Sequence, residues 1–258
     1  MKTVLKILIA IPLLYLIMMP FYLVGSTNAK SVTDVEIIIS DSADYQFITK
    51  DRLFNLLLSS SGNVVGKPVK EISLGEIEKS MKTVKEIKVA EAYITIDGKL
   101  KIWVKQRHPI MRVMPNEGGD YFIDEEGMVI RRQNLYNPRL HIVIGNINIS
   151  QAMLNGVSVL DTTIKNSILK DIYYLVSHVN KDAFWSAQID QIYVDRNNSI
   201  DLIPRVGNHV VRLGSVENFE GKLKNLDAFY KNVLPEVGWN KYSVINLEFK
   251  DQIVCKKR

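Results

Sequence analysis

An uncharged apolar run near the start of the chain limits what this sequence can fold into. No residue from Ile7 to Val24 is charged, and two lysines precede the run. At about 1.5 Å per residue, a helix of this length just crosses the hydrocarbon core of a bilayer. Because basic residues favour the cytoplasmic side, we predict a cytoplasmic end at residues 1–6, a transmembrane helix at residues 7–25, and export of the remainder.

A cleaved signal peptide is the alternative interpretation of the same segment. The residues Thr27-Asn28-Ala29 form a weak cleavage site. The apolar run is longer than the roughly 7–15 residues of a typical signal sequence, which favours an uncleaved anchor. The sequence leaves cleavage open.

Charge and cysteine content argue against a nucleic-acid-binding protein and against a fold held by internal disulfides. The 258 residues carry a formal net charge of +5, and the longest basic run is the tail at residues 256–258. A protein that binds nucleic acid usually concentrates its basic residues in a patch, so we expect no nucleic-acid partner. Cys255 is the single cysteine, and no internal disulfide can form.

Residues 31–107 predict a small domain with the order β-α-α-β-β. Thr49 is placed to cap the first helix, and Ser73 followed by Glu76 has the spacing of a capping box for the second. Asp97-Gly98 is a strong hairpin dipeptide between two alternating strands. A small sheet covered by two helices would bury the apolar residues of this segment.

Residues 108–255 predict a second α+β domain built mainly on antiparallel strands. Short alternating segments indicate strands, and two longer segments have apolar residues at helical spacing. The two helical stripes consist of Ile164, Ile168, Ile172, Leu175 and Val179, and of Phe219, Leu223, Leu226, Tyr230 and Val233.

The closing stretch alternates between apolar and polar residues from Ile245 to Phe249. Ile245, Leu247 and Phe249 fall on one face of an extended chain, and Val244, Asn246 and Glu248 fall on the other. This alternation predicts a half-buried strand that continues to Cys255. A terminal strand often lies at the edge of a sheet, where a strand of another chain can pair with it.

No motif in the sequence predicts catalysis or a metal. The four histidines lack metal-ligand spacing, and no paired-cysteine, zinc-protease or phosphate-loop motif is present. The cluster Asp124-Glu125-Glu126 is interpreted as a solvated turn. Asp171 and His178 lie two helical turns apart, and a functional pair and a surface helix face explain them equally well. Cys255 is interpreted as a small hydrophobe of the last strand. We expect no catalytic residue, no metal and no cofactor.

The order of these segments resembles the FtsQ/DivIB family of bacterial division proteins. The similarity extends over nearly the whole chain in local stretches of weak individual specificity. The matching residues are Leu100, Ile102, Val104, Arg107 and Pro109; Ile123, Asp124, Gly127 and Val129; Val211, Leu213, Gly214, Lys222 and Leu223; and the stretch SVINLEF. Asn246 and Glu248 depart from the family, where Asp and Arg are common.

The resemblance implies a non-catalytic scaffold at the division septum. Residues 31–107 would form a POTRA domain, and the second domain would bind the coiled-coil membrane proteins FtsB and FtsL. The protein would be a single-pass inner-membrane protein with its bulk in the periplasm and no small-molecule substrate. The alternative is a membrane-anchored exported enzyme acting on envelope polymers. The implied partner-binding residues are Tyr242, Val244, Asn246, Leu247, Glu248, Phe249, Phe229 and Tyr230.

Overall fold

The chain folds into two units, which are described separately below. The computed structural model describes residues 14–15, 18–19, 31–43, 45–132, 136–165, 167–250 and 252–258. The units divide between Arg107 and His108. The predicted cytoplasmic end and transmembrane helix, residues 1–6 and 7–25, lie outside the described residues apart from four positions. Within the described part, no helix has the length and apolar character needed to cross a bilayer.

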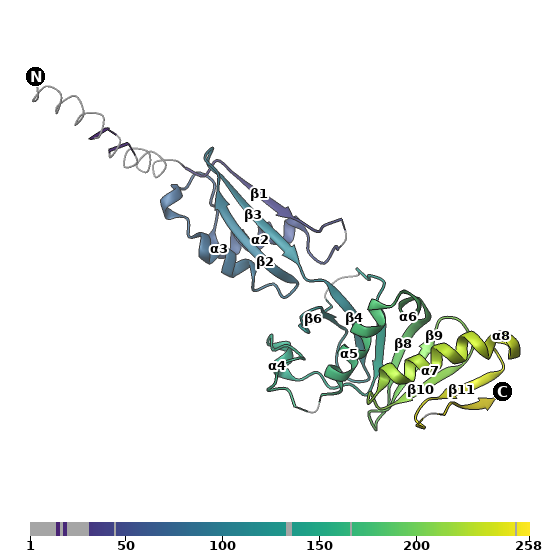
Figure 1. The fold of residues 1–258 in the computed structure, drawn as a ribbon. Helices are drawn as coiled ribbons and strands as arrows, with labels where there is room; N and C mark the ends of the chain where they lie inside the picture. The colour runs from purple at the N-terminus through teal and green to yellow at the C-terminus, as the bar shows by residue number, and fades with distance from the viewer. Residues whose placement is uncertain are drawn as a thin grey trace, which may run out of the picture. The chain divides into compact units, whose positions relative to one another are not determined.

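The first unit is a three-stranded sheet with two helices, in the predicted order β-α-α-β-β (Figure 1). Strand β3 lies in the centre, parallel to β1 and antiparallel to β2. Leu53 and Leu57 of the first helix and Ile77 and Met81 of the second are buried in its core. The elements are β1 (Asp34–Ile39), α2 (Lys50–Ser61), η1 (Val69–Glu71), α3 (Leu74–Met81), β2 (Ile87–Ile94) and β3 (Lys99–Gln106).

The two predicted helix caps of this unit differ in outcome. The Thr49 side chain accepts a hydrogen bond from the Arg52 backbone N–H, which confirms the cap of α2. The Ser73 side chain makes no capping bond at α3, so the predicted capping box is wrong. Another glutamate of α3 has a structural contact instead: Glu78 accepts the backbone N–H of Ala92 at 2.9 Å and ties the helix to β2.

A buried glutamine at the end of β3 holds the segment between β1 and α2. Gln106 is fully buried, and its side-chain oxygen accepts the backbone N–H groups of Phe47 and Ile48 at 3.0 and 3.1 Å. Its amide nitrogen donates to Asp41 and to the Tyr45 carbonyl. Because a buried backbone N–H without an acceptor is costly, this one side chain stabilises the whole segment.

The second unit contains a mixed sheet of nine strands in the order β12-β11-β10-β9-β8-β7-β4-β5-β6. Five neighbouring pairs are antiparallel, and three are parallel: β4 with β7, β7 with β8, and β10 with β11. The strands are β4 (Pro109–Pro115), β5 (Tyr121–Asp124), β6 (Val129–Arg131), β7 (His141–Gly145), β8 (Ile189–Val194), β9 (Ile200–Pro204), β10 (Val210–Gly214), β11 (Tyr242–Asn246) and β12 (Val254–Lys257).

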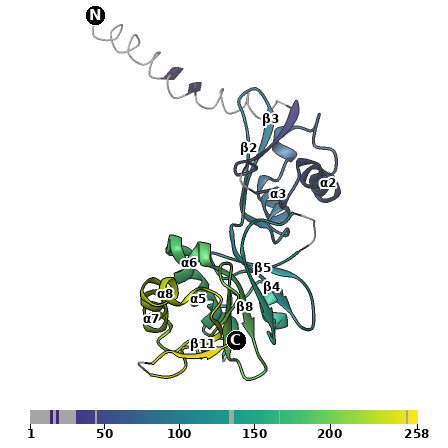
Figure 2. The same cartoon turned by 90° about the vertical axis from the view of Figure 1, so that its right-hand side faces the viewer.

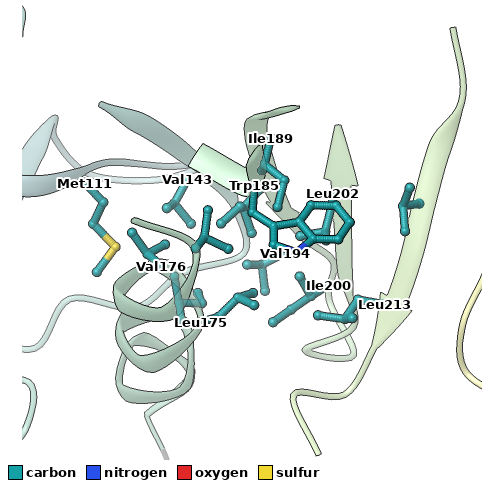
Figure 3. Close-up of a cluster of buried hydrophobic side chains, with 14 of the residues drawn as sticks. Met111, Val143, Leu175, Val176, Trp185, Ile189, Val194, Ile200, Leu202 and Leu213 are labelled. Atoms are coloured by element: carbon teal, nitrogen blue, oxygen red, sulfur yellow. The ribbon is translucent and has the colours of Figure 1, made fainter. Parts of the chain in front are cut away.

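Helices pack on one face of this sheet and close the core (Figure 2). Figure 3 shows Leu175 and Val176 of α5 directed toward Val143, Val194 and their neighbours on the strands. The helix α6, which the sequence did not predict, contributes the buried Trp185. The helices are α4 (Gln151–Leu154), α5 (Ile168–Lys181), α6 (Ala183–Gln188), α7 (Phe219–Asn232) and α8 (Leu234–Val237).

Candidate functional site

The closing stretch forms two strands, not the single strand that its alternation predicts. β11 ends at Asn246, and β12 returns antiparallel beside it from Val254. The Asn246 side chain accepts the backbone N–H of Glu248 at 2.8 Å and donates to the Glu248 carboxylate at 3.0 Å. These local bonds compete with strand pairing, so the chain leaves the sheet after Leu247. Phe249, predicted to lie on the buried face, is 53% exposed.

The prediction that residues Val244 to Phe249 form the sheet edge is therefore wrong. Val244 pairs with Val210 on β10 and with Lys256 on β12. Asn246 likewise pairs with Arg212 on one side and Val254 on the other. Since both sides of β11 are occupied by strands of the same chain, β11 has no free edge.

Two other residues of the predicted set lie in the core. Leu247 and Tyr230 are each 3% exposed. The Tyr230 hydroxyl lies 2.8 Å from Nε2 of His209, and Trp239 packs edge-on against the Tyr230 ring. Burial raises the pKa of Tyr230 far above its usual value and lowers the pKa of His209. This cluster anchors α7 to the sheet.

Two residues of the predicted partner-binding set, Phe229 and Tyr242, do lie next to each other. Their ring centroids lie 5.9 Å apart, and both side chains are half-buried. Phe229 comes from α7 and Tyr242 from the start of β11. The pair forms a partly exposed aromatic surface beside the last strands.

The edge of the sheet at this end is β12, which the sequence pattern did not separate from the preceding strand. β12 pairs with β11, and no other described strand pairs with its second side. Val254 is 45% exposed, and Lys256 and Lys257 are exposed. The Ser243 hydroxyl donates to the carbonyls of Lys256 and Lys257 and fastens the end of the hairpin. The sequence does contain an indication of a turn between the two strands, because an asparagine such as Asn246 often bonds the backbone two residues further on and starts a turn.

A groove runs between α7 and the segment that joins β11 to β12. Two adjoining hollows of about 360 and 410 Å3 share Asn225, Gln252 and Ile253 in their lining. Phe249 lines the first hollow and Phe229 the second. The site at this end of the second unit thus combines an open strand edge, a groove lined by both apolar and polar residues, and exposed basic residues.

Lys222 fixes one wall of this groove. Its ammonium group donates to the carbonyls of Leu213 and Ser215 at 2.9 and 2.8 Å. Burial lowers the pKa of Lys222, and the carboxylates of Glu248 and Glu217 oppose that effect. The Glu248 side chain lies against Gly214, where an added Cβ would come within 2.6 Å of Glu248 Cγ and where the φ of +72° favours glycine. These contacts hold α7, β10 and the segment after β11 in one arrangement.

The groups considered for catalysis do not converge in the described part of the chain. Asp124 is buried, contrary to the predicted solvated turn, and its carboxylate accepts the backbone N–H groups of Glu126 and Met128. Nδ1 of His178 lies 3.5 Å from a carboxylate oxygen of Glu220 on α7. Burial raises the pKa of the Cys255 thiol, which makes it a weaker nucleophile. No group of three or more potential metal ligands was found among the described residues.

Comparison with known families agrees with this two-unit architecture. Residues 30–105 match the POTRA-like domain, so the first unit is a POTRA-like domain. Residues 108–256, more than half of the chain, match the family described as FtsQ/DivIB, C-terminal related. The chain belongs to the FtsQ/DivIB family of bacterial cell-division proteins. None of the curated proteins compared matches the sequence.

Proposed function

We propose that this protein is a non-catalytic scaffold of the division machinery that binds FtsB- and FtsL-type coiled-coil membrane proteins through its second unit. The main observation in support of this proposal is that one edge of β12 is not paired with any other described strand. An extended segment of the partner would add to the sheet there, with main-chain hydrogen bonds giving affinity and side chains giving selectivity. The binding strand proposed from the sequence, Val244 to Phe249, is replaced by Val254–Lys257.

The charge of the edge supports a partner segment with acidic residues. Lys256, Lys257 and Arg258 follow one another at the end of the hairpin, and the exposed Lys241 lies beside them, since its carbonyl accepts the Arg258 backbone N–H. Lysines on an edge strand also discourage pairing between two copies of the same chain. An acidic strand would complement these charges and associate faster at low salt.

The adjacent groove supports a second contact with the same partner. Phe249 and Ile253 offer apolar surface on one wall, and Phe229 offers it on the α7 side. A partner chain that leaves the β12 edge in the direction of α7 would bury these side chains. Exposed Glu248 and half-buried Tyr242 would lie at the border of this contact.

The proposed location is the inner membrane at the division septum. Residues 7–25 would anchor the chain with the N-terminus in the cytoplasm and both units in the periplasm. Family membership and the apolar run of the sequence support this arrangement.

Charge reversal on the edge strand tests the proposal. Lys256→Glu with Lys257→Glu should weaken binding of the purified FtsB–FtsL-type complex from the same organism by at least about tenfold, mostly through slower association. Biolayer interferometry on the full chain in detergent measures both rates. The matched control carries Lys181→Glu and Lys224→Glu, two exposed lysines on α5 and α7. Equal affinity of both double variants and the unchanged protein would refute binding at the edge.

A further inference from the structure

A large hollow of the second unit lies away from the β12 edge, at the carboxyl ends of three adjacent parallel strands. Its volume is about 990 Å3, and Pro115 and Gly145 at the ends of β4 and β7 line it together with the loop after β8. Loops diverge at the carboxyl ends of parallel strands, and open α/β sheets bind ligands in the crevice there. Buried Ile147 and Met153 give the hollow a rigid floor.

The lining is unusually rich in side-chain amides. Asn116, Asn146, Asn148 and Asn198 all line the hollow and are exposed. Asn146 and Asn148 alternate with Ile147, whose side chain packs in the core, so the two amides lie on the solvent side of their loop. Among the described residues, none of these four side chains has a hydrogen-bond partner. Each therefore offers two donors and an acceptor to a ligand.

The charges around the hollow favour an anionic ligand. Lys165 and Arg196 line it, are exposed, and form no ion pair with another described residue. Among the described residues of the lining, Glu117 is the single acidic one, which leaves a formal excess of one positive charge. An exposed guanidinium without a carboxylate partner is free to bind a ligand carboxylate in a bidentate manner.

We propose that this hollow is a second binding site of the protein and takes an acidic peptide segment. Asparagine amides can pair with both the N–H and the C=O of a peptide main chain, and Lys165 and Arg196 would receive acidic side chains. The volume lies within the range of about 300–1,000 Å3 that small-ligand sites occupy. A glycan fits less well, because the only aromatic ring among the described lining residues, that of Tyr121, is 7% exposed and offers no face for a sugar ring.

Fluorescence anisotropy with defined probes tests this site on the full chain in detergent. The first probe is a dye-labelled octapeptide of alternating glycine and glutamate. The other two are a glycine–serine octapeptide and an acidic oligosaccharide of galacturonate units. The variants are Arg196→Glu and the double variant Asn146→Ala, Asn148→Ala. The controls are Lys181→Glu and the double variant Asn232→Ala, Asn240→Ala, which alter exposed residues outside the hollow.

We expect the acidic peptide to bind at least about tenfold more tightly than the neutral one, and Arg196→Glu to weaken it by at least about tenfold. The amide double variant should weaken it by about threefold or more, and both controls should change it by less than about twofold. Absence of binding by the acidic peptide would overturn the proposal, and so would binding that Arg196→Glu leaves unchanged, because the peptide would then be held elsewhere, for example at the basic β12 edge. Equal binding of the acidic oligosaccharide, unaffected by loss of the two amides, would also overturn it, because the site would then recognise charge alone.

Discussion

Ile245 of β11 lies directly opposite Cys255 of β12 in an antiparallel pair. The outer edge of β11, the penultimate strand, is therefore paired within the chain and is not open to a partner strand. Ile245 is fully buried, whereas Cys255 is half-buried and belongs to the strand with the free side. The strand edge proposed for partner binding is therefore that of β12 and not that of β11. β11 instead joins the C-terminal hairpin to the sheet through its pairing with β10.

Truncation of Ile245 should destabilise the second unit. Ile245→Ala removes a fully buried side chain and should lower the free energy of unfolding by about 2–4 kcal/mol. Phe249→Ala, at a position that is 53% exposed three residues after β11, should change it by less than about 0.5 kcal/mol. Urea unfolding of the full chain measures both. Similar losses for the two variants would show that the closing stretch packs as one continuous strand.

Gln106 should be essential for the order of the segment before α2. Gln106→Leu leaves the backbone N–H groups of Phe47 and Ile48 without their buried acceptor, at a cost of at least about 2 kcal/mol. Hydrogen–deuterium exchange at these two amides should become much faster, while exchange in the second unit stays unchanged. Lys105→Leu, at the half-exposed neighbouring position, is the control. Unchanged protection of both amides in Gln106→Leu would contradict the assigned role.

Asp120 should contribute stability that disappears in acid. Burial acts to raise its pKa, but hydrogen bonds from Arg112 and Arg132 outweigh burial and hold the pKa below its usual value of 3.8. A carboxyl with a depressed pKa stabilises the folded state above its unfolded pKa, and that contribution is lost as the pH falls through the folded value.

The matching experiment compares thermal unfolding of the unchanged protein and Asp120→Asn. The unchanged protein should have the higher unfolding midpoint temperature. The difference in midpoint temperature between the two proteins should be largest near neutral pH and should shrink as the pH falls from about 5 to about 3. Asp190→Asn breaks an exposed ion pair with Arg205 and serves as the control. A difference for Asp120→Asn that stays constant over this range would show that its ionisation does not stabilise the fold.

The parts of the fold that local chemistry determines could be predicted from the sequence. The cap at Thr49 and the hairpin at Asp97-Gly98 depend on a few neighbouring residues, and both form. The central residues of both helical stripes, such as Ile172 and Leu226, are likewise buried as expected, whereas Ile164 precedes α5 and Val233 follows α7. Long periodic segments carry enough apolar residues to identify the face that enters the core.

The remaining features depend on contacts that are distant in sequence. Six residues form α6, too few to establish a helical period, and its position depends on Trp185 entering the core. The alternation from Val244 to Cys255 fits one strand or two, and the hydrogen bonds of Asn246 decide between them. The sequence thus predicted an edge strand in the closing stretch but assigned the edge to the residues of β11 and not to β12. It also missed the amide-lined hollow, whose residues come from separate loops.

Cross-linking through the native cysteine tests the central claim most directly. Cys255 is the single cysteine of the chain and lies on β12. In neighbouring strands, opposite Cβ atoms lie about 4.5–5.5 Å apart, close enough for oxidation to join suitably placed pairs. Single cysteines would be placed at successive positions along the periplasmic end of an FtsB-type partner and oxidised at about pH 8.5, where more of the thiol is ionised.

Because side chains of a strand alternate between faces, we predict disulfides to Cys255 at alternate partner positions within one short segment. The Lys256→Glu, Lys257→Glu variant should reduce all of them together. Disulfides that repeat every three or four positions would indicate a helical partner instead. No disulfide at any position in a complex that still forms would contradict binding of the partner along β12.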